Sequence, residues 1–123
     1  ITTRDLARIG QLVLDGGRAH NGVEVVPQGW IKDMRANGDR RAWVEGNFAD
    51  MFAEGRYRSC WYDVGDRRGS IAAVGIHGQW LWVDPTSRVV IARTACRPDP
   101  SDDDATALEI LMLGQIARAF GER

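Results

Sequence analysis

The sequence predicts an α+β fold, in which helices cover an antiparallel sheet of three to four strands joined as a meander. Apolar residues recur every three or four positions near both ends of the chain, a spacing typical of amphipathic helices. In the middle of the chain the spacing changes to two, and short turns separate the runs, as in antiparallel strands. The 123 residues, 44% hydrophobic and 27% charged, suit one domain over 1–123.

Two helices are expected within residues 2–36. Thr2 and Asp5 predict a capping box for the first helix, and Gly16-Gly17 predicts its end. The apolar stripe of this helix consists of Leu6, Ile9, Leu12 and Val13. Pro27 is expected at the first position of the second helix, since proline is well suited to that place. The second helix carries Trp30, Ile31 and Met34.

No single period fits residues 37–54, so an irregular loop with one helical turn is expected there. The antiparallel strands are expected within 55–94. One strand is predicted where side chains alternate from Tyr57 to Tyr62, and Gly65 and Gly69 bracket the turn that follows. The later strands are predicted at 70–74, 79–83 and 88–93.

A last helix is expected over 101–120. Ser101 is predicted as its N-cap, and the run from Asp102 to Asp104 places negative charge where a helix dipole favours it. A cation site is the alternative explanation of this acidic run, but the helix start is favoured. The apolar residues of the helix are Leu108, Leu111, Met112, Ile116 and Phe120.

The charge balance argues against a nucleic-acid partner, and the lack of a long apolar run argues against a membrane span. Sixteen basic and 17 acidic residues give a net charge of −1, whereas nucleic-acid-binding domains are usually basic. Trp80 and Trp82 share one face of a predicted strand and could stack on bases, but without a basic groove they are better explained as core. No apolar run approaches the roughly 20 residues that cross a bilayer.

No metal, cofactor or disulfide is predicted. His20, His77, Cys60 and Cys96 stand isolated in the sequence, without the spaced pairs of a metal site. The glycines of Gly75–Gly78 lack the Lys-Ser/Thr of a phosphate-binding loop. Two cysteines do not form a disulfide framework, so reduced and packed thiols are expected.

The segment from Ala73 to Val83 draws attention because its glycines lie between two predicted strands. Glycine there lets a ligand approach the backbone closely, and backbone N–H groups can stabilise a developing oxyanion. The alternative is an ordinary glycine turn with His77 exposed to solvent. The residues alone favour this alternative.

Four strings of residues carry a resemblance to a known family. They are Thr3-x-Asp5-Leu6-Ala7-Arg8-x-Gly10, Val26-Pro27-x-x-Trp30-Ile31, Gly55-Arg56-Tyr57-Arg58-x-x-Trp61-Tyr62 and Gly75-Ile76-His77-Gly78-Gln79-x-x-x-Val83-Asp84-Pro85. In this order they resemble the C-terminal part of the penicillin-recognising serine hydrolases, the class C β-lactamase-like superfamily. Within it the chain is most similar to the 6-aminohexanoate-dimer hydrolase and family VIII esterase branch.

The resemblance implies the C-terminal portion of a β-lactamase/transpeptidase-like fold, from a longer cytoplasmic enzyme. The nucleophile and base of such an enzyme, a Ser-x-x-Lys motif and a tyrosine, would lie in an N-terminal catalytic half that is missing here. The family's Lys-Thr-Gly matches Ala73-Val74-Gly75, which assigns the oxyanion-hole N–H to Ile76. Aligning the motif's glycine with Gly78 instead assigns that role to Gln79.

Ala73 replaces the lysine that holds a β-lactam carboxylate in the family, so an amidase or esterase acting on small substrates is the better expectation. Gly75, His77 and Trp61 are the expected substrate-binding residues. Without its nucleophile the chain alone is expected to be inactive.

The alternative is a non-catalytic α+β binding module of the same ancestry that associates with a partner or with itself. A fragment of a hydrolase should expose the apolar face that meets the N-terminal half, whereas an adapted binding module should carry polar residues on that face.

Overall fold

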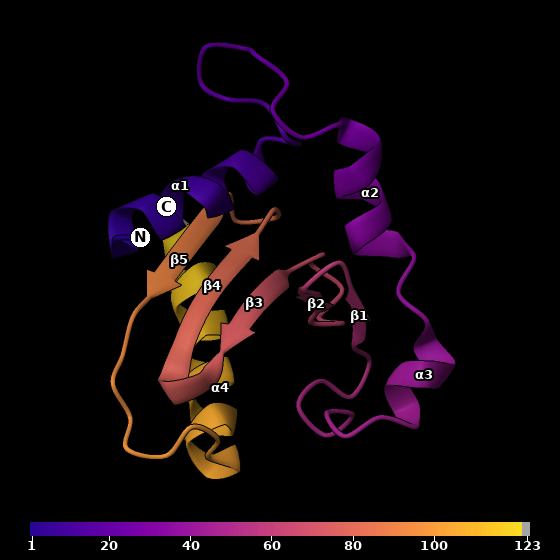
Figure 1. The fold of residues 1–123 in the computed structure, drawn as a ribbon, viewed down its shortest axis with the longest axis vertical. Helices are drawn as coiled ribbons and strands as arrows, with labels where there is room; N and C mark the ends of the chain where they lie inside the picture. The colour runs from indigo at the N-terminus through magenta and orange to yellow at the C-terminus, as the bar shows by residue number, and fades with distance from the viewer. Residues whose placement is uncertain (122–123) are drawn as a thin grey trace.

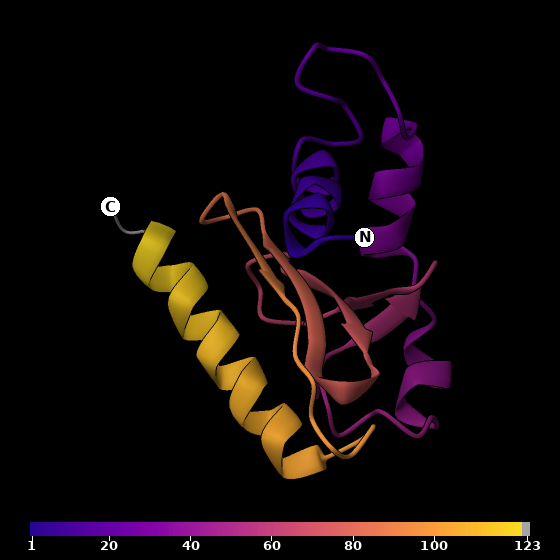
Figure 2. The ribbon, with the colours of Figure 1, turned by 60° about the vertical axis from the view of Figure 1, so that its left-hand side comes forward.

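Five antiparallel strands form one sheet, and helices lie against both of its faces (Figures 1 and 2). The computed structural model describes residues 1–121. Its elements are α1 (Thr3–Leu14), α2 (Gln28–Ala36), α3 (Arg40–Val44), β1 (Arg56–Arg58), β2 (Trp61–Asp63), β3 (Ile71–Gly75), the 3-10 turn η1 (Ile76–Gly78), β4 (Gln79–Asp84), β5 (Val89–Arg93) and α4 (Asp103–Gly121). Sheet order follows chain order. The predicted α+β meander is therefore confirmed, with five strands in place of three to four.

The additional strand arises because the run predicted as one strand folds back on itself. Arg58 pairs with Trp61, so only Ser59 and Cys60 lie between β1 and β2. Both have positive φ angles, of 52° and 68°, which is the backbone of a tight two-residue hairpin turn. Side-chain alternation continues through these residues, and for this reason the periodicity did not reveal the turn.

Strand β4 is buried on both faces of the sheet. Trp80 and Trp82, 1% and 2% exposed, pack in one apolar cluster with Leu113 of α4. Val83, on the opposite face, packs in a second cluster with Val13 of α1. Burial leaves neither tryptophan ring available to stack on a base, so both belong to the core.

Helix α4 packs against the sheet through a different side from the one predicted from its apolar residues. The buried residues of this helix are Glu109, Leu113 and Ala117. Four of the residues named from the sequence are instead exposed, by 41% to 68%: Leu108, Leu111, Met112 and Phe120. The sequence could not identify the buried side, because α4 is apolar on most of its circumference.

The helix starts also differ in detail from the prediction. The capping box of Thr2 and Asp5 is confirmed at α1. At α4, Asp102 accepts the N–H of Ala105 at 2.9 Å, so the cap is Asp102 and not Ser101. Pro27 is the residue before α2 and not its first residue, a difference within the usual uncertainty of helix ends.

In α1, the close approach to the sheet depends on Gly10. Ile9 is 42% exposed, against prediction, while Gly10 is buried. A Cβ at Gly10 would lie 2.5 Å from Val90 Cγ1 and 2.8 Å from Leu81 Cδ1. The absence of a side chain therefore allows α1 to lie directly on β4 and β5.

We expect Gly10→Ala to destabilise the chain by about 1–3 kcal/mol, because overpacking outweighs the gain in helix propensity. Gly29→Ala is the matched control, since no atom lies within 4 Å of its Cβ position. Urea unfolding measures both variants. An alanine at position 10 that is tolerated as well as one at position 29 would contradict the close packing of α1.

Both cysteines are exposed and unpaired. The expectation of reduced thiols agrees with this, but the expectation that they are packed is wrong: Cys60 lies in the hairpin turn and Cys96 in the segment after β5. Over residues 1–121, no helix has the length and apolar character needed to span a membrane.

Candidate active site

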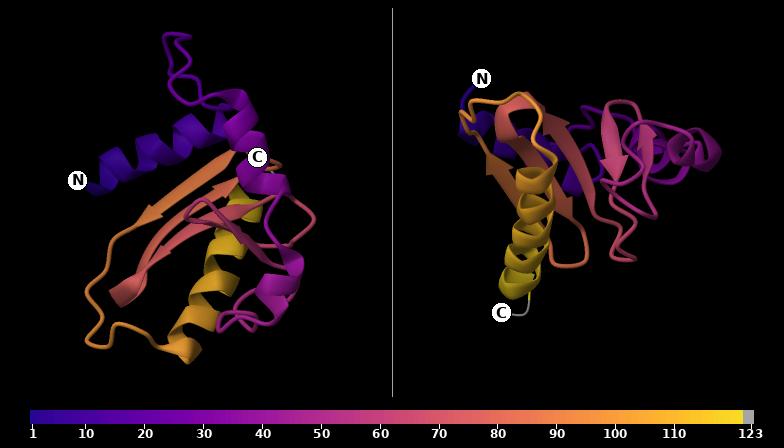
Figure 3. Two further views of the ribbon diagram at one scale, coloured as in Figure 1. Left: turned by 45° about the vertical axis from the view of Figure 1, so that its right-hand side comes forward. Right: turned by 90° about the horizontal axis from the view of Figure 1, so that it is seen from below.

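The turn η1 joins β3 to β4 at one end of the sheet, and the segment between β5 and α4 runs beside it (Figure 3). Two backbone hydrogen bonds connect them: the N–H of His77 donates to Pro100 O at 3.0 Å, and the N–H of Arg97 donates to His77 O at 3.3 Å. The three predicted residues Gly75, Ile76 and His77 are consecutive here. The conformation of η1 is thus stabilised by the segment between β5 and α4 as well as by the pairing of β3 with β4.

His77 has an uncommon backbone conformation, with φ of 59° and ψ of 23°. A non-glycine residue in this left-handed region costs roughly 1–2 kcal/mol. Its imidazole Nδ1 lies 2.8 Å from the carbonyl oxygen of Arg97. Since a carbonyl only accepts, Nδ1 carries a hydrogen and donates it to this oxygen.

Gly78 and Gln79 close the turn. Gly78 has a φ of 82°, and a Cβ there would lie 2.9 Å from both Arg93 Nη1 and Arg97 Nε. Gln79 begins β4 and pairs with Gly75. Its side-chain N–H donates to Ala95 O, and its side-chain oxygen accepts the N–H of Ala95 at 3.2 Å. These two bonds hold the segment after β5 against the start of β4.

Ile76 occupies the first position of the turn and is 65% exposed. An apolar side chain this exposed contributes little to the core. The structure therefore presents Ile76 at the surface, directly after the extended Gly75, whose φ and ψ are −120° and 162°.

Trp61 lies in β2, one residue before Tyr62, which pairs with Ala72 of β3. It packs against the apolar cluster that includes Val13 and Ile71. Because side chains alternate along a strand, Trp61 is on the same sheet face as Gly75. Trp61 is thus partly buried in β2, beside β3.

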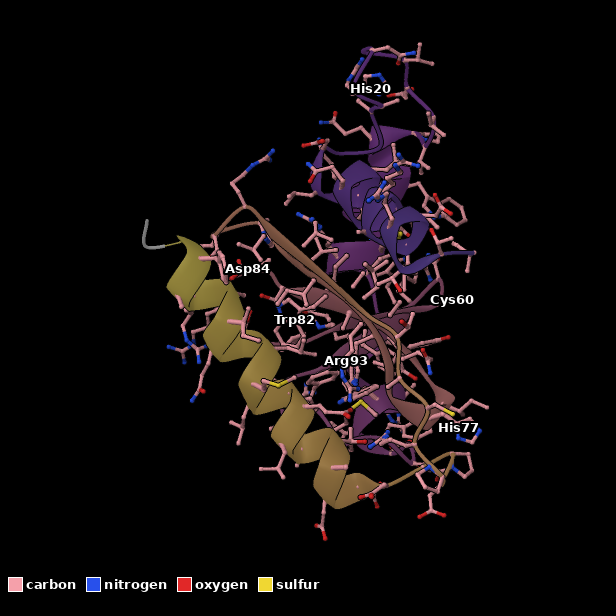
Figure 4. The ribbon with its side chains drawn as sticks, turned by 90° about the vertical axis from the view of Figure 1, so that its left-hand side faces the viewer. His20, Cys60, His77, Trp82, Asp84 and Arg93 are labelled. Carbon is pink, nitrogen blue, oxygen red and sulfur yellow. The ribbon has the colours of Figure 1, made fainter. Side chains whose placement is uncertain are left out.

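Sequence reasoning missed a group of charged residues beneath the turn. Arg93, labelled in Figure 4, donates from Nη1 to Gly78 O at 2.6 Å, and the same atom lies 2.8 Å from Glu109 Oε1. Arg97 Nη1 lies 3.7 Å from the same oxygen. The available signal was Glu109 itself, an acidic residue four positions before Leu113 on the side of α4 that the structure buries.

Two hollows of the surface lie away from this turn. One of about 340 Å³ lies between the start of α4 and loop residues 47–51, and one of about 440 Å³ lies beside α1 and residues 18–25. Within residues 1–121, no group of three or more His, Cys, Asp or Glu side chains is placed to hold a metal ion.

Comparison with known proteins connects this fold and turn to hydrolases. The chain is 42% identical over 119 residues to the 6-aminohexanoate-dimer hydrolase of Paenarthrobacter ureafaciens, and the match covers 97% of the chain. A solved structure from Bacillus anthracis, described as a 6-aminohexanoate-dimer hydrolase, superposes with a TM-score of 0.76 and 26% identity over 98% of the chain. The resemblance predicted from the sequence motifs is confirmed.

The chain matches only part of the length of each of these two proteins. The chain spans 30% of the length of the Paenarthrobacter relative and 29% of the Bacillus structure. No family model matches the chain. The similarity therefore concerns about a third of such a hydrolase.

Proposed function

We propose that this chain is the C-terminal part of a serine hydrolase that cleaves amide or ester bonds by acyl transfer. The observation that carries the proposal is the 42% identity over nearly the whole chain to a 6-aminohexanoate-dimer hydrolase. The proposed substrates are small linear amides or esters, of the kind named for that relative. The chain supplies an oxyanion-hole N–H and part of the substrate pocket.

In the proposed reaction, a serine of the N-terminal half gives its hydroxyl proton to the lysine–tyrosine base of that half and bonds to the substrate carbonyl carbon, and the carbonyl oxygen becomes an oxyanion; the base later returns this proton to the leaving group. The Ile76 N–H donates to this oxygen. The C–N or C–O bond then breaks, the leaving amine or alcohol takes a proton, and water hydrolyses the acyl-serine to release the acid. One such donor contributes about 10²–10³-fold to kcat.

The structure of the turn supports this role for Ile76. Strain at His77 is compensated by hydrogen bonds to Arg97 and Pro100, so the turn keeps one conformation in the absence of substrate. A donor that is already in place costs no reorganisation during the reaction. Gly75, His77 and Trp61 are proposed to form the pocket wall around it.

Penicillins are proposed to be poor substrates. The residue at the lysine position is Ala73, which pairs with Leu81 inside the sheet. A methyl group cannot pair with the carboxylate of a β-lactam, and an ion pair or hydrogen bond to a charged group contributes about 1.5–3 kcal/mol. Neutral linear substrates do not require that contact.

A fluorophosphonate probe, which labels activated serines, tests the proposed function. We expect the full-length gene product to be labelled once per chain and the isolated 123-residue chain to remain unlabelled, since the nucleophile lies outside it. Intact mass spectrometry measures both. Labelling of the isolated chain, or an unreactive full-length product, would falsify the proposal.

The second candidate is the binding module without catalysis. Leu108, Leu111 and Met112 on the outer side of α4 are 68%, 61% and 41% exposed. An exposed face this apolar supports packing of the chain against another protein surface. In the first proposal this surface belongs to the N-terminal catalytic half, and in the second it belongs to a partner. The isolated chain is proposed to self-associate through it, and sedimentation velocity would detect this.

A further inference from the structure

A buried carboxylate joins three elements beneath the turn that carries Ile76. Glu109 of α4 is 8% exposed. Its Oε2 accepts a hydrogen bond of 2.7 Å from the indole N–H of Trp80 in β4, and its Oε1 lies 2.8 Å from Arg93 Nη1 in β5. Because a buried charge is costly without partners, the indole and the guanidinium together account for a carboxylate at this depth.

Arg93 connects Glu109 to the turn. The same Nη1 that faces the carboxylate donates to the carbonyl oxygen of Gly78 at 2.6 Å. The guanidinium groups of Arg93 and Arg97 pack directly against this backbone, since a Cβ at position 78 would lie 2.9 Å from both. The carbonyl of Arg97 also accepts the imidazole hydrogen of His77. The two arginines thus hold the turn in different ways: Arg93 through its guanidinium, which also faces Glu109, and Arg97 through its backbone.

We infer that Glu109 is a positioning residue for the proposed reaction, which acts through Arg93 to hold η1 in the conformation that presents the Ile76 N–H. This inference rests on the proposed function. An oxyanion donor must be aimed to within about 0.5 Å of its productive position. Loss of the carboxylate is expected to release the Arg93 guanidinium and to displace the turn.

The test is Glu109→Gln in the full-length gene product, assayed on an amide substrate. We expect kcat to fall about 10- to 100-fold, part of the effect of removing an oxyanion donor, while KM changes less than about two-fold, because the lost interaction belongs to the transition state. Glu45→Gln is the matched control. It removes an exposed carboxylate that lies 3.0 Å from Arg41 and should leave kcat unchanged.

A merely structural role predicts a lower melting temperature with an unchanged kcat for the folded enzyme, and that result overturns the inference. If Glu109→Gln does not fold, Arg93→Lys serves instead: lysine keeps the positive charge but has a shorter side chain that lacks the Nη1 donating to Gly78. A folded Arg93→Lys enzyme with wild-type kcat overturns the inference equally. A wild-type product without activity overturns the proposed function as well, and in that case Glu45→Gln is inactive too.

Discussion

Replacing Ile76 by proline is expected to lower kcat of the full-length gene product by about 10²–10³-fold, the effect of losing one oxyanion-hole donor. Proline has no backbone N–H, so the substitution removes the proposed donor itself. Gly75 has a ψ of 162°, close to the range that a residue before proline adopts. The Ile76 side chain is 65% exposed, and its loss should cost little stability. Steady-state kinetics on an amide and an ester measure the effect.

Ile76→Ala is the control for this prediction. It removes the same exposed side chain but keeps the N–H, so its kcat should stay near the wild-type value. A proline variant that folds and reacts as fast as the alanine variant would show that the Ile76 amide is not the donor. The role would then pass to Gln79, as in the alternative alignment of the glycine motif.

The sheet could be predicted from the sequence because strands and turns are local patterns. Alternation of side chains and glycine-bounded turns are visible within a few residues, and they gave the meander correctly. The hairpin turn at Ser59 and Cys60 was missed since neither residue is typical of a turn with two positive φ angles. The buried side of α4 depends on which residues meet the sheet, and an almost uniformly apolar helix does not encode that choice locally.

The site was predictable only in part for the same reason. Gly75, Ile76 and His77 are adjacent in the sequence, so a motif could identify them. The groups that hold the turn are distant: Trp80 and Glu109 are 29 residues apart, and His77 and Arg97 are 20 apart. Such contacts arise from the pairing of β4 with β5 and the packing of α4, and no sequence spacing indicates them.

At the opposite end of β4 from His77 lies Asp84, which is 1% exposed (Figure 4). Its carboxylate accepts hydrogen bonds of 3.0 Å from Arg68 Nε and from the N–H of Ser87, and Arg68 also donates to the Ser87 hydroxyl. We expect Asp84→Asn to lower the free energy of unfolding by about 3 kcal/mol at pH 7, because one partner of a buried pair loses its charge. Urea unfolding of the chain measures this loss.

Asp15→Asn is the control, since Arg88 and Asp15 form an ion pair of 2.8 Å that is largely exposed. Its loss should cost less than about 1 kcal/mol. Equal losses in both variants would contradict a special role for the buried pair.

The loss at Asp84 should also depend on pH. Burial alone raises the pKa of Asp84, but the hydrogen bonds from Ser87 and Arg68 outweigh it and hold the pKa below its ordinary value of 3.8. A carboxyl group with a lowered pKa in the folded state stabilises the fold fully above 3.8, and this stabilisation disappears as the pH falls through the folded-state value. The difference in unfolding free energy between wild type and Asp84→Asn should therefore shrink below pH 3.8. A difference that stays constant from pH 7 to pH 3 would mean that the charge of Asp84 does not stabilise the fold.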